Sequence, residues 1–283
     1  MDYVNPEALV STRWLADHLD SPGLRVVDGS WHMPQLKRDA RAEFEAGHIP
    51  GAVYFDIDRI ADRADPLPHM LPDAATFARD VGALGIANDA HVVAYDTVGV
   101  GSAARVWWTF RAFGHENVSV LDGGLPKWLA EGRPVARGPA TPRAATYKAR
   151  LDAALVRGLA EVRAAVANGS EQILDARSRG RFAGTEPEPR AGLRGGHMPG
   201  ALSQPYLELY EGEAKTMKQA ADLRALFKDA GLDLSRPVVT SCGSGVTACN
   251  LALALHLIGK PDVAVYDGSW TEWGGRDDTP IET

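Results

Sequence analysis

The chain lacks several features that would mark whole classes of protein. Only two of its 283 residues are cysteines, Cys242 and Cys249, which is too few for a disulfide-stapled fold. Without a matching set of His or Cys residues, two thiols also make a poor zinc site. No apolar run reaches 18 residues, so no transmembrane helix is predicted.

Basic residues are not in excess either, because 30 Lys and Arg face 37 Asp and Glu, for a net charge of −7. A general nucleic-acid-binding or membrane-binding surface is therefore not expected. Residues 1–7 contain no basic region followed by an apolar stretch, so we expect no signal peptide and a cytoplasmic location. The remaining composition, 45% hydrophobic and 24% charged, is ordinary for a globular protein, and the length suits two domains.

The sequence contains an internal repeat of about half its length. Four landmarks recur in the same order at offsets of 145 to 149 residues. They are an Asp after an apolar run (Asp28 and Asp175), a Gly-His-Ile/Met-Pro-Gly-Ala motif (47–52 and 196–201), a strand-like run (91–96 and 237–242) and an Asp-Gly pair before a Trp (Asp122 and Asp267). The chain is therefore predicted to consist of two copies of one unit.

Each copy alternates short β-branched runs with helix-like stretches. Strands are predicted over 26–27, 92–95 and 118–121, and helices over 72–84, 103–113, 154–168, 220–230 and 246–258. This alternation predicts an α/β fold in which each domain is a mostly parallel sheet flanked by helices. Ligands bind at the carboxyl ends of the strands in such sheets, where Asp96 and Cys242 both fall.

Composition sets the limits of the two units. A segment rich in Pro, Gly, Arg and Ala, without periodicity, separates them. We predict an N-terminal domain over 1–135, a linker over 136–152 that lies on the surface, and a C-terminal domain over 153–283. A second irregular stretch, 180–196, is expected to be a long loop inside the second domain, and such loops are often functional.

Cys242 ends a predicted strand and opens the loop Cys-Gly-Ser-Gly-Val-Thr, after which a helix begins. Gly243 and Gly245 let the backbone curl so that N–H groups point inward, and the helix N-terminus adds partial positive charge. Such a cradle stabilises an anion, including the thiolate that makes Cys a nucleophile. A Cys242 that only packs under the sheet would not need a polar cradle, so we favour a reactive thiol. Cys249 lies about two turns further, too far for a disulfide, and is predicted to pack in the core.

This loop resembles that of the 3-mercaptopyruvate sulfurtransferases of the rhodanese superfamily. The resemblance covers nearly the whole chain, including the duplication, the two Gly-His motifs, Tyr-Asp-Gly-Ser-Trp at 266–270 and Glu-Pro-Glu-Pro-Arg at 186–190. It implies an enzyme that carries sulfur as a persulfide on Cys242, with 3-mercaptopyruvate as the donor and no metal or organic cofactor. The implied acceptor is thioredoxin, a low-molecular-weight thiol or cyanide.

The resemblance also implies roles for residues that bind the donor. Arg181 and Arg190 match the arginines that hold its carboxylate and ketone oxygen, and Arg194 is a weaker candidate. The alternative for the pair is two solvated arginines beside Glu186 and Glu188. The backbone N–H groups expected to stabilise the persulfide belong to Gly243, Gly245, Val246 and Thr247.

A proton relay of Ser244, His69 and Asp58 is implied by the same resemblance. The alternative for His69 is a loop histidine bonded to the backbone. Asp96 stands in the first domain where Cys242 stands in the second, so the first domain is expected to lack the nucleophile. The Gly-His motif recurs in both copies, with His48 in the copy that lacks the Cys and His197 in the copy that has it. This recurrence favours a structural role in a turn for both histidines.

Three other functions fit parts of this sequence pattern. Thiosulfate-specific rhodaneses typically carry basic residues directly after the Cys, where this chain has Gly243 and Ser244, so thiosulfate is the less favoured donor. A Cys phosphatase needs an Arg after five residues, where Ala248 stands. A non-catalytic redox or persulfide sensor that uses Cys242 stays open.

Overall fold

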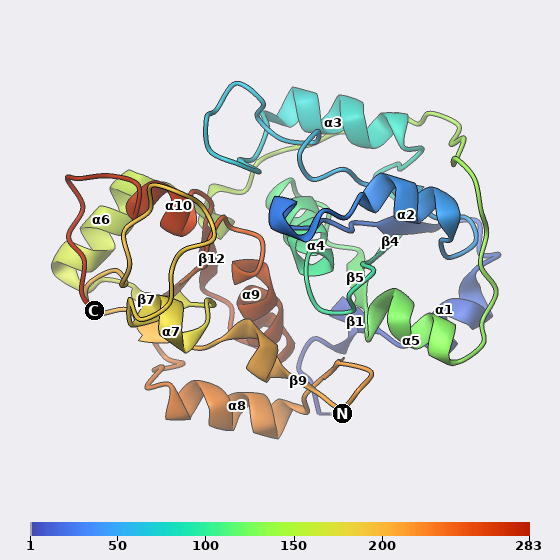
Figure 1. Cartoon of the computed structure of the whole chain (residues 1–283). Helices are drawn as coiled ribbons and strands as arrows, with labels where there is room; N and C mark the ends of the chain where they lie inside the picture. The colour runs from blue at the N-terminus through green and yellow to red at the C-terminus, as the bar shows by residue number, and fades with distance from the viewer. Residues whose placement is uncertain (1) are drawn as a thin grey trace.

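The computed structural model describes residues 2–283 and contains two parallel five-stranded sheets (Figure 1). The first sheet has the order β1-β5-β4-β2-β3, and all of its neighbouring strands are parallel. Its strands are β1 (Leu9–Val10), β2 (Leu24–Asp28), β3 (Val53–Tyr54), β4 (His91–Tyr95) and β5 (Val118–Leu121).

The second sheet repeats this arrangement, with the order β6-β12-β11-β7-β8. Its strands are β6 (Val156–Arg157), β7 (Gln172–Asp175), β8 (Leu202–Ser203), β11 (Val238–Ser241) and β12 (Val263–Tyr266), again all parallel. Matching strands occupy matching places, so the duplication and the α/β class predicted from the sequence are confirmed. The second half also contains a small antiparallel hairpin, β9 (Tyr210–Glu211) with β10 (Thr216–Met217).

Helices cover the sheets on both faces. In the first half they are α1 (Thr12–His18), α2 (Ala40–Ala46), α3 (Ala74–Ala83), α4 (Ala103–Ala112) and α5 (Gly124–Ala130). In the second half they are α6 (Leu159–Asn168), α7 (Arg179–Phe182), α8 (Ala220–Asp229), α9 (Ala248–Leu257) and α10 (Ser269–Trp273). Short 3-10 helices add η1 (Pro6–Ala8), η2 (Pro34–Leu36), η3 (Ala153–Leu155) and η4 (Tyr206–Leu209).

The predicted helix over 154–168 began too early. The polypeptide first forms η3 and then β6, which pairs with β12, and α6 starts only at Leu159 with Gly158 as its N-cap. Strand pairing across the sheet decides the structure of Val156 and Arg157, and a local helix pattern does not contain that information. The other predicted helices lie within two residues of α3, α4, α8 and α9.

Residues 131–152 contain no helix or strand and run along the first domain. Ala136 exchanges backbone hydrogen bonds with His48 at 3.0 and 2.9 Å, and the N–H group of Ala145 donates to the carbonyl of Gly82 at 2.9 Å. The segment is therefore held to the first domain by regular backbone bonds along its path.

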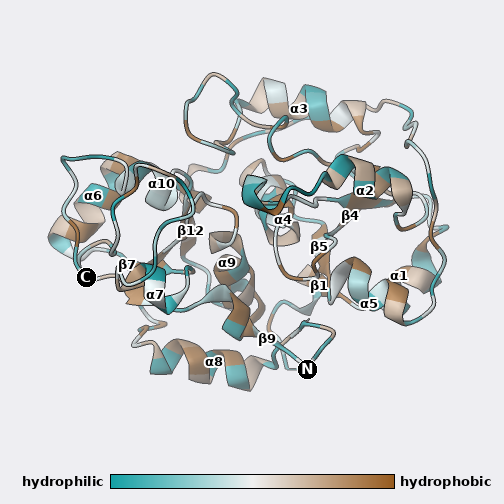
Figure 2. Ribbon diagram, in the orientation of Figure 1, coloured by the Kyte–Doolittle hydropathy of each residue, from teal (hydrophilic) through white to brown (hydrophobic). Residues whose placement is uncertain are grey.

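Helices α4 and α9 lie side by side between the two sheets (Figure 1). Helix α9 is buried all round except at His256, as expected for a helix enclosed by both domains. In contrast, the turns of the peripheral helix α8 alternate between hydrophobic and hydrophilic residues in Figure 2, and it buries Leu223 and Phe227 on one face. The hydrophobic core continues across the domain interface through α4 and α9.

The two Gly-His motifs make the same contacts in each copy. The Nδ1 atom of His48 lies 2.8 Å from the carbonyl of Phe44, and that of His197 lies 2.8 Å from the carbonyl of Phe182. Each ring also stacks on the phenyl ring of that partner, with centroids 4.0 and 3.8 Å apart. The structural role predicted for these histidines is confirmed.

Across residues 2–283, the model has no helix of the length and hydrophobicity that crossing a membrane requires.

Candidate active site

Cys242 directly follows β11 and lies in front of α9, as predicted. Its side chain is buried in the free thiol form. The N–H group of Cys242 donates to Ser269 Oγ at 3.1 Å, and its carbonyl accepts from Trp270 at 3.0 Å. The start of α10 therefore fixes the backbone of Cys242 from the side.

The loop after Cys242 forms a cradle of backbone donors. Within residues 2–283, the N–H groups of Gly243 through Thr247 donate to no protein acceptor. Gly245 has φ +76, and a Cβ atom there would lie 2.6 Å from the carbonyl oxygen of Asp267, so only glycine fits. A cradle of free N–H groups at a helix start is suited to an anion.

In the equivalent loop of the first domain the anion is a side chain of the loop itself, the carboxylate of Asp96. One carboxylate oxygen of Asp96 accepts from the N–H groups of Val98 at 3.0 Å and Gly99 at 2.7 Å, and the other from Ala103 at 3.0 Å. The fold thus builds an anion cradle in both copies. The first copy fills it with Asp96, and the second leaves it open beside Cys242.

Two arginines, Arg181 in α7 and Arg190 in the loop that follows it, lie over the loop after Cys242. A Cβ atom on Gly243 would be 3.0 Å from Nη2 of Arg181 and 3.9 Å from Nη1 of Arg190. Arg190 makes no hydrogen bond or ion pair to any residue in the described chain. Burial lowers the pKa of its guanidinium, and the nearby Cys242 works against this shift. A half-buried guanidinium without an ionic partner in residues 2–283 is suited to bind an anionic group such as a carboxylate.

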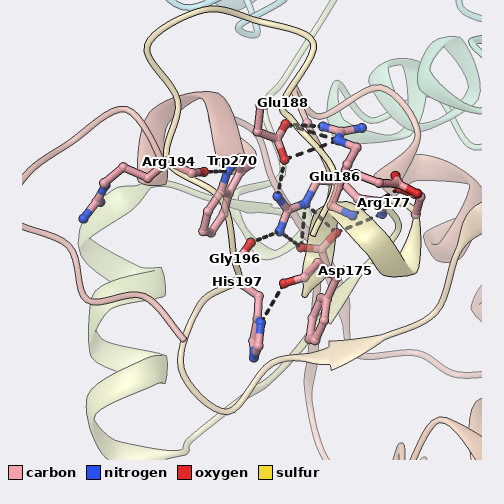
Figure 3. A network of polar contacts seen from close by, with 12 residues as sticks. Asp175, Arg177, Glu186, Glu188, Arg194, Gly196, His197 and Trp270 are labelled. Atoms are coloured by element: carbon pink, nitrogen blue, oxygen red, sulfur yellow. Dashed lines mark hydrogen bonds and ion pairs between the residues drawn. The ribbon is translucent and has the colours of Figure 1, made fainter. Parts of the chain in front are cut away.

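Arg181 is held in place by the buried carboxylate of Glu188, which Figure 3 shows within a network that also contains Arg177 and Asp175. Glu188 accepts from Nη2 of Arg181 at 2.6 Å and from Nη1 of Arg177 at 2.7 Å, and its side chain is 2% exposed. Arg177 also binds Asp175 through its Nε and Nη2 atoms, and it stacks on Trp270 at 4.1 Å. The chain Asp175–Arg177–Glu188–Arg181 connects the end of β7 to the site.

Arg194, the weaker candidate, does not face the site. Its guanidinium donates to the backbone carbonyls of Trp273, Gly274 and Thr279 at 3.1 to 3.2 Å. These carbonyls lie at and after the end of α10, near the C-terminus. By donating to them, Arg194 stabilises this C-terminal segment. The prediction of a substrate role for Arg194 is wrong.

Asp58 and His69 meet, as the relay requires. The Nδ1 atom of His69 lies 2.6 Å from Oδ1 of Asp58, whose other oxygen accepts from the indole of Trp31 at 2.9 Å. Burial works to raise the pKa of Asp58, but His69 and Trp31 outweigh it and lower that pKa. Burial also lowers the pKa of His69, although Asp58 works to raise it.

No hydrogen bond joins His69 to Ser244 in the described part of the chain, and the Nε2 atom of His69 is buried without a partner. His69 has φ +64, a backbone conformation that a non-glycine residue adopts only when its surroundings impose it. The structure thus brings two relay members together and leaves the third contact open.

Arg105 on α4 ties the histidine loop to the catalytic loop. Its Nη2 atom donates to the carbonyl of His69, and its Nη1 atom donates to Asp267 Oδ1 at 2.6 Å and to the carbonyl of Gly245 at 3.3 Å. Asp267 in turn accepts from the N–H group of Leu71 at 2.8 Å. The ion pair is buried, with side chains 2% and 5% exposed. Sequence reasoning missed Arg105, although a charged residue between Ala104 and Val106 in an apolar helix is a signal for a buried partner.

A cleft of about 740 Å³ opens over the catalytic loop between the two domains. The predicted site residues that line it are Arg181, Arg190, Cys242, Gly243, Ser244, Val246 and Thr247. Asp58, His69 and Gly245 are not among the residues that line it. Cys249 is fully buried with its Sγ atom 3.2 Å from the carbonyl of Gly245, and burial raises its pKa well above the ordinary range. The prediction that Cys249 packs in the core is confirmed.

In residues 2–283 no group of three or more His, Cys, Asp or Glu side chains is placed to hold a metal ion.

Comparison with known proteins matches this architecture. The model of the rhodanese-like domain matches twice, over residues 11–131 and 159–276. The chain belongs to the rhodanese family. The match covers both halves, so the first domain is a rhodanese domain despite its Asp96.

Relatives of this rhodanese carry two enzyme names. The 3-mercaptopyruvate sulfurtransferase of Homo sapiens is 48% identical over 94% of this chain and 91% of its own length. The thiosulfate sulfurtransferase of Cricetulus griseus is 49% identical with the same coverage. Among solved structures, SseA from Escherichia coli, described as a 3-mercaptopyruvate sulfotransferase, has a TM-score of 0.85 at 39% identity, over 93% of this chain and 98% of that one. Overall identity therefore does not separate the two donors.

The buried Arg105–Asp267 pair gives a stability prediction. Arg105→Leu leaves a buried carboxylate without its cation, so the free energy of unfolding should fall by about 3–5 kcal/mol. Urea denaturation followed by tryptophan fluorescence measures this loss. Arg111→Leu, on the same helix but without an ion pair, is the matched control. An equal loss in both variants would show that the pair does not hold the two loops together.

Proposed function

We propose that this rhodanese is a sulfurtransferase that moves sulfur from 3-mercaptopyruvate, through a persulfide on Cys242, to a thiol acceptor or cyanide. The observation that carries the proposal is the loop after Cys242, whose backbone N–H groups have no acceptor in residues 2–283 and over which Arg190 lies without an ionic partner. In the equivalent loop of the first domain the carboxylate of Asp96 accepts from such N–H groups. A nucleophilic thiol, an anion site for its product and a carboxylate anchor are what this reaction needs.

In the first half-reaction the Cys242 thiolate attacks the sulfur of 3-mercaptopyruvate. Arg190 and Arg181 hold the carboxylate and ketone oxygen of the donor, and Glu188 keeps Arg181 in position. The new S–S bond forms as the C–S bond breaks, and the electron pair passes into the enolate of pyruvate. The N–H groups of the 243–247 loop stabilise the persulfide left on Cys242.

Ser244, His69 and Asp58 manage the proton in this proposal. Neutral His69 accepts the proton of the donor thiol through the Ser244 hydroxyl, and Asp58 stabilises the imidazolium that forms. The same proton returns to the enolate carbon and gives pyruvate. Each loading step then ends with the relay in its starting state.

The choice of donor rests on the residues after Cys242. Thiosulfate is a dianion that would gain from basic side chains at 243 and 244, but this chain has Gly243 and Ser244 there. A side chain at 243 would also compete with Arg181 for space, because its Cβ atom would lie 3.0 Å from that guanidinium. We therefore favour the monocarboxylate donor over thiosulfate, although the relatives' names include both.

In the second half-reaction a thiol such as that of thioredoxin or a small thiol, or cyanide, removes the outer sulfur. No metal or organic cofactor takes part in the proposed steps, and the domain limits 1–135, 136–152 and 153–283 stay predictions. So does the cytoplasmic location, since one relative, from Arabidopsis thaliana, is named mitochondrial. A persulfide sensor without turnover is the remaining alternative.

The donor assignment can be tested by steady-state kinetics with 3-mercaptopyruvate and thiosulfate, each with a thiol and with cyanide as acceptor. Wild type should prefer 3-mercaptopyruvate, and Cys242→Ser should lose about a thousandfold or more of the activity because it lacks the nucleophile. Preference for thiosulfate would overturn the donor but keep the nucleophile. Absence of turnover with every pair would favour the sensor.

Arg190→Ala should raise the KM for 3-mercaptopyruvate roughly 10- to 100-fold, because a charge-assisted contact to the carboxylate is lost. Arg179→Ala is the control, since Arg179 is exposed and paired with Glu208 on the surface. An unchanged KM in the Arg190 variant would refute the anchor role.

The relay predicts a pH dependence. His69 must be neutral to accept the proton, and its pKa is lowered by burial, so kcat should fall only as pH drops below the ordinary histidine value of about 6.5. In His69→Gln this acidic limb should disappear together with most of kcat. Identical pH profiles for the two proteins would exclude His69 from proton transfer.

A further inference from the structure

We propose that Gln35 of the first domain is a positioning residue for the donor site, because its side chain holds the backbone that presents Arg190 to the substrate. The inference deepens the proposed function and rests on it, since it concerns the arginine assigned to the donor carboxylate. The donor site is thus shared between the two domains, although both of its arginines belong to the second.

The backbone around Arg190 has few contacts of its own. Within the described chain, no N–H or carbonyl group of residues 187–193 takes part in a backbone–backbone hydrogen bond. Pro187 and Pro189 have no N–H group to donate. The one hydrogen bond that reaches this backbone, among the residues the structure describes, is donated by Nε2 of Gln35 to the carbonyl of Pro189 at 2.7 Å. Arg190 directly follows that carbonyl, so its backbone is held from the first domain.

The neighbouring fixed points of the segment lie on either side of this bond. Before it, Glu188 is held by its two buried ion pairs. After it, the next backbone bond is that of the N–H group of Arg194, which donates to the carbonyl of Gly274 at 3.1 Å. Arg190 lies between these points, and its own guanidinium has no partner in residues 2–283. The position of Arg190 therefore depends on the carbonyl that Gln35 binds.

The loop that carries Gln35 is fixed at both of its ends by one carboxylate. Glu43 on α2 accepts from Nε and Nη2 of Arg38 at 2.7 Å each, and its Oε2 atom lies 2.9 Å from Nε2 of His32. Gln35 is the middle residue of η2, between these two ties. Because the loop is already ordered, little further conformational entropy is lost when the Gln35 side chain forms its bond.

The Gln35 bond lies at the cleft itself. Gln35, Pro189 and Arg190 all line the cleft that Cys242 also lines, and Gln35 is exposed. An exposed hydrogen bond contributes little to the stability of the whole fold, because water replaces it readily. Its loss should therefore act on the placement of Arg190 and leave the fold intact.

A double-mutant cycle with Arg190 tests this role. Gln35→Met keeps the length of the side chain but removes the N–H donor, so the KM for 3-mercaptopyruvate should rise roughly two- to tenfold, as expected for one lost hydrogen bond. The kcat should not change, because the carboxylate contact is the same in the bound donor and in the transition state. In the Arg190→Ala background the same substitution should have no further effect on KM.

Two further variants separate the donor group from a general effect on the protein. Gln35→Lys restores an N–H donor of similar reach, so its KM should return toward the wild-type value. Gln219→Met is the matched control, because Gln219 is exposed, makes no capping hydrogen bond and does not line the cleft. Urea denaturation should give the same midpoint for wild type and both Met variants.

A wild-type KM in Gln35→Met would overturn the inference, as would an equal rise in KM in the Arg190→Ala background or a rise that Gln35→Lys does not reverse. Each of these results leaves the proposed function intact. An unchanged KM in Arg190→Ala, or no release of pyruvate from 3-mercaptopyruvate by the wild type, would instead contradict the proposed function, and this inference with it.

Discussion

Backbone N–H groups without a protein acceptor are the constraint from which the rest of this structure follows. In the loop after β11 the N–H groups of residues 243–247 donate to no acceptor within residues 2–283, and buried donors cost free energy unless an acceptor takes them. Gly245 allows the required backbone, Ser269 and Trp270 hold Cys242, and Arg105 with Asp267 fixes the loop from the first domain. An anion on Cys242 would supply the acceptor that these N–H groups lack.

The duplication solves the same constraint in two ways. In the first domain Asp96 supplies the anion permanently, and that copy is free to act as the wall and brace of the site. It contributes Trp31, Asp58 and His69, and through Arg105 it holds the loop of the second domain. The division of labour is visible only because both copies keep the same sheet order.

Much of this could be predicted from the sequence, for identifiable physical reasons. Cys242 and its glycines are contiguous in the sequence, so the conformation of their loop depends mainly on neighbouring residues and can be predicted locally. The start of α6 could not be predicted, because the pairing of β6 with β12 joins residues about a hundred positions apart. The same holds for Arg105, whose partner Asp267 is 162 residues away in the sequence. The substrate role predicted for Arg194 was wrong because the sequence does not show which acceptors a loop arginine will reach, and here they are backbone carbonyls near the C-terminus.

The carboxylate of Asp96 has a consequence for stoichiometry. Asp96 closes one cradle with its own side chain, and Cys249 does not line the cleft. The proposed reaction therefore leaves each chain one place for sulfane sulfur, at Cys242. In that reaction each molecule would hold one equivalent and would have to release it before accepting another, so the doubled fold would carry one sulfur atom at a time.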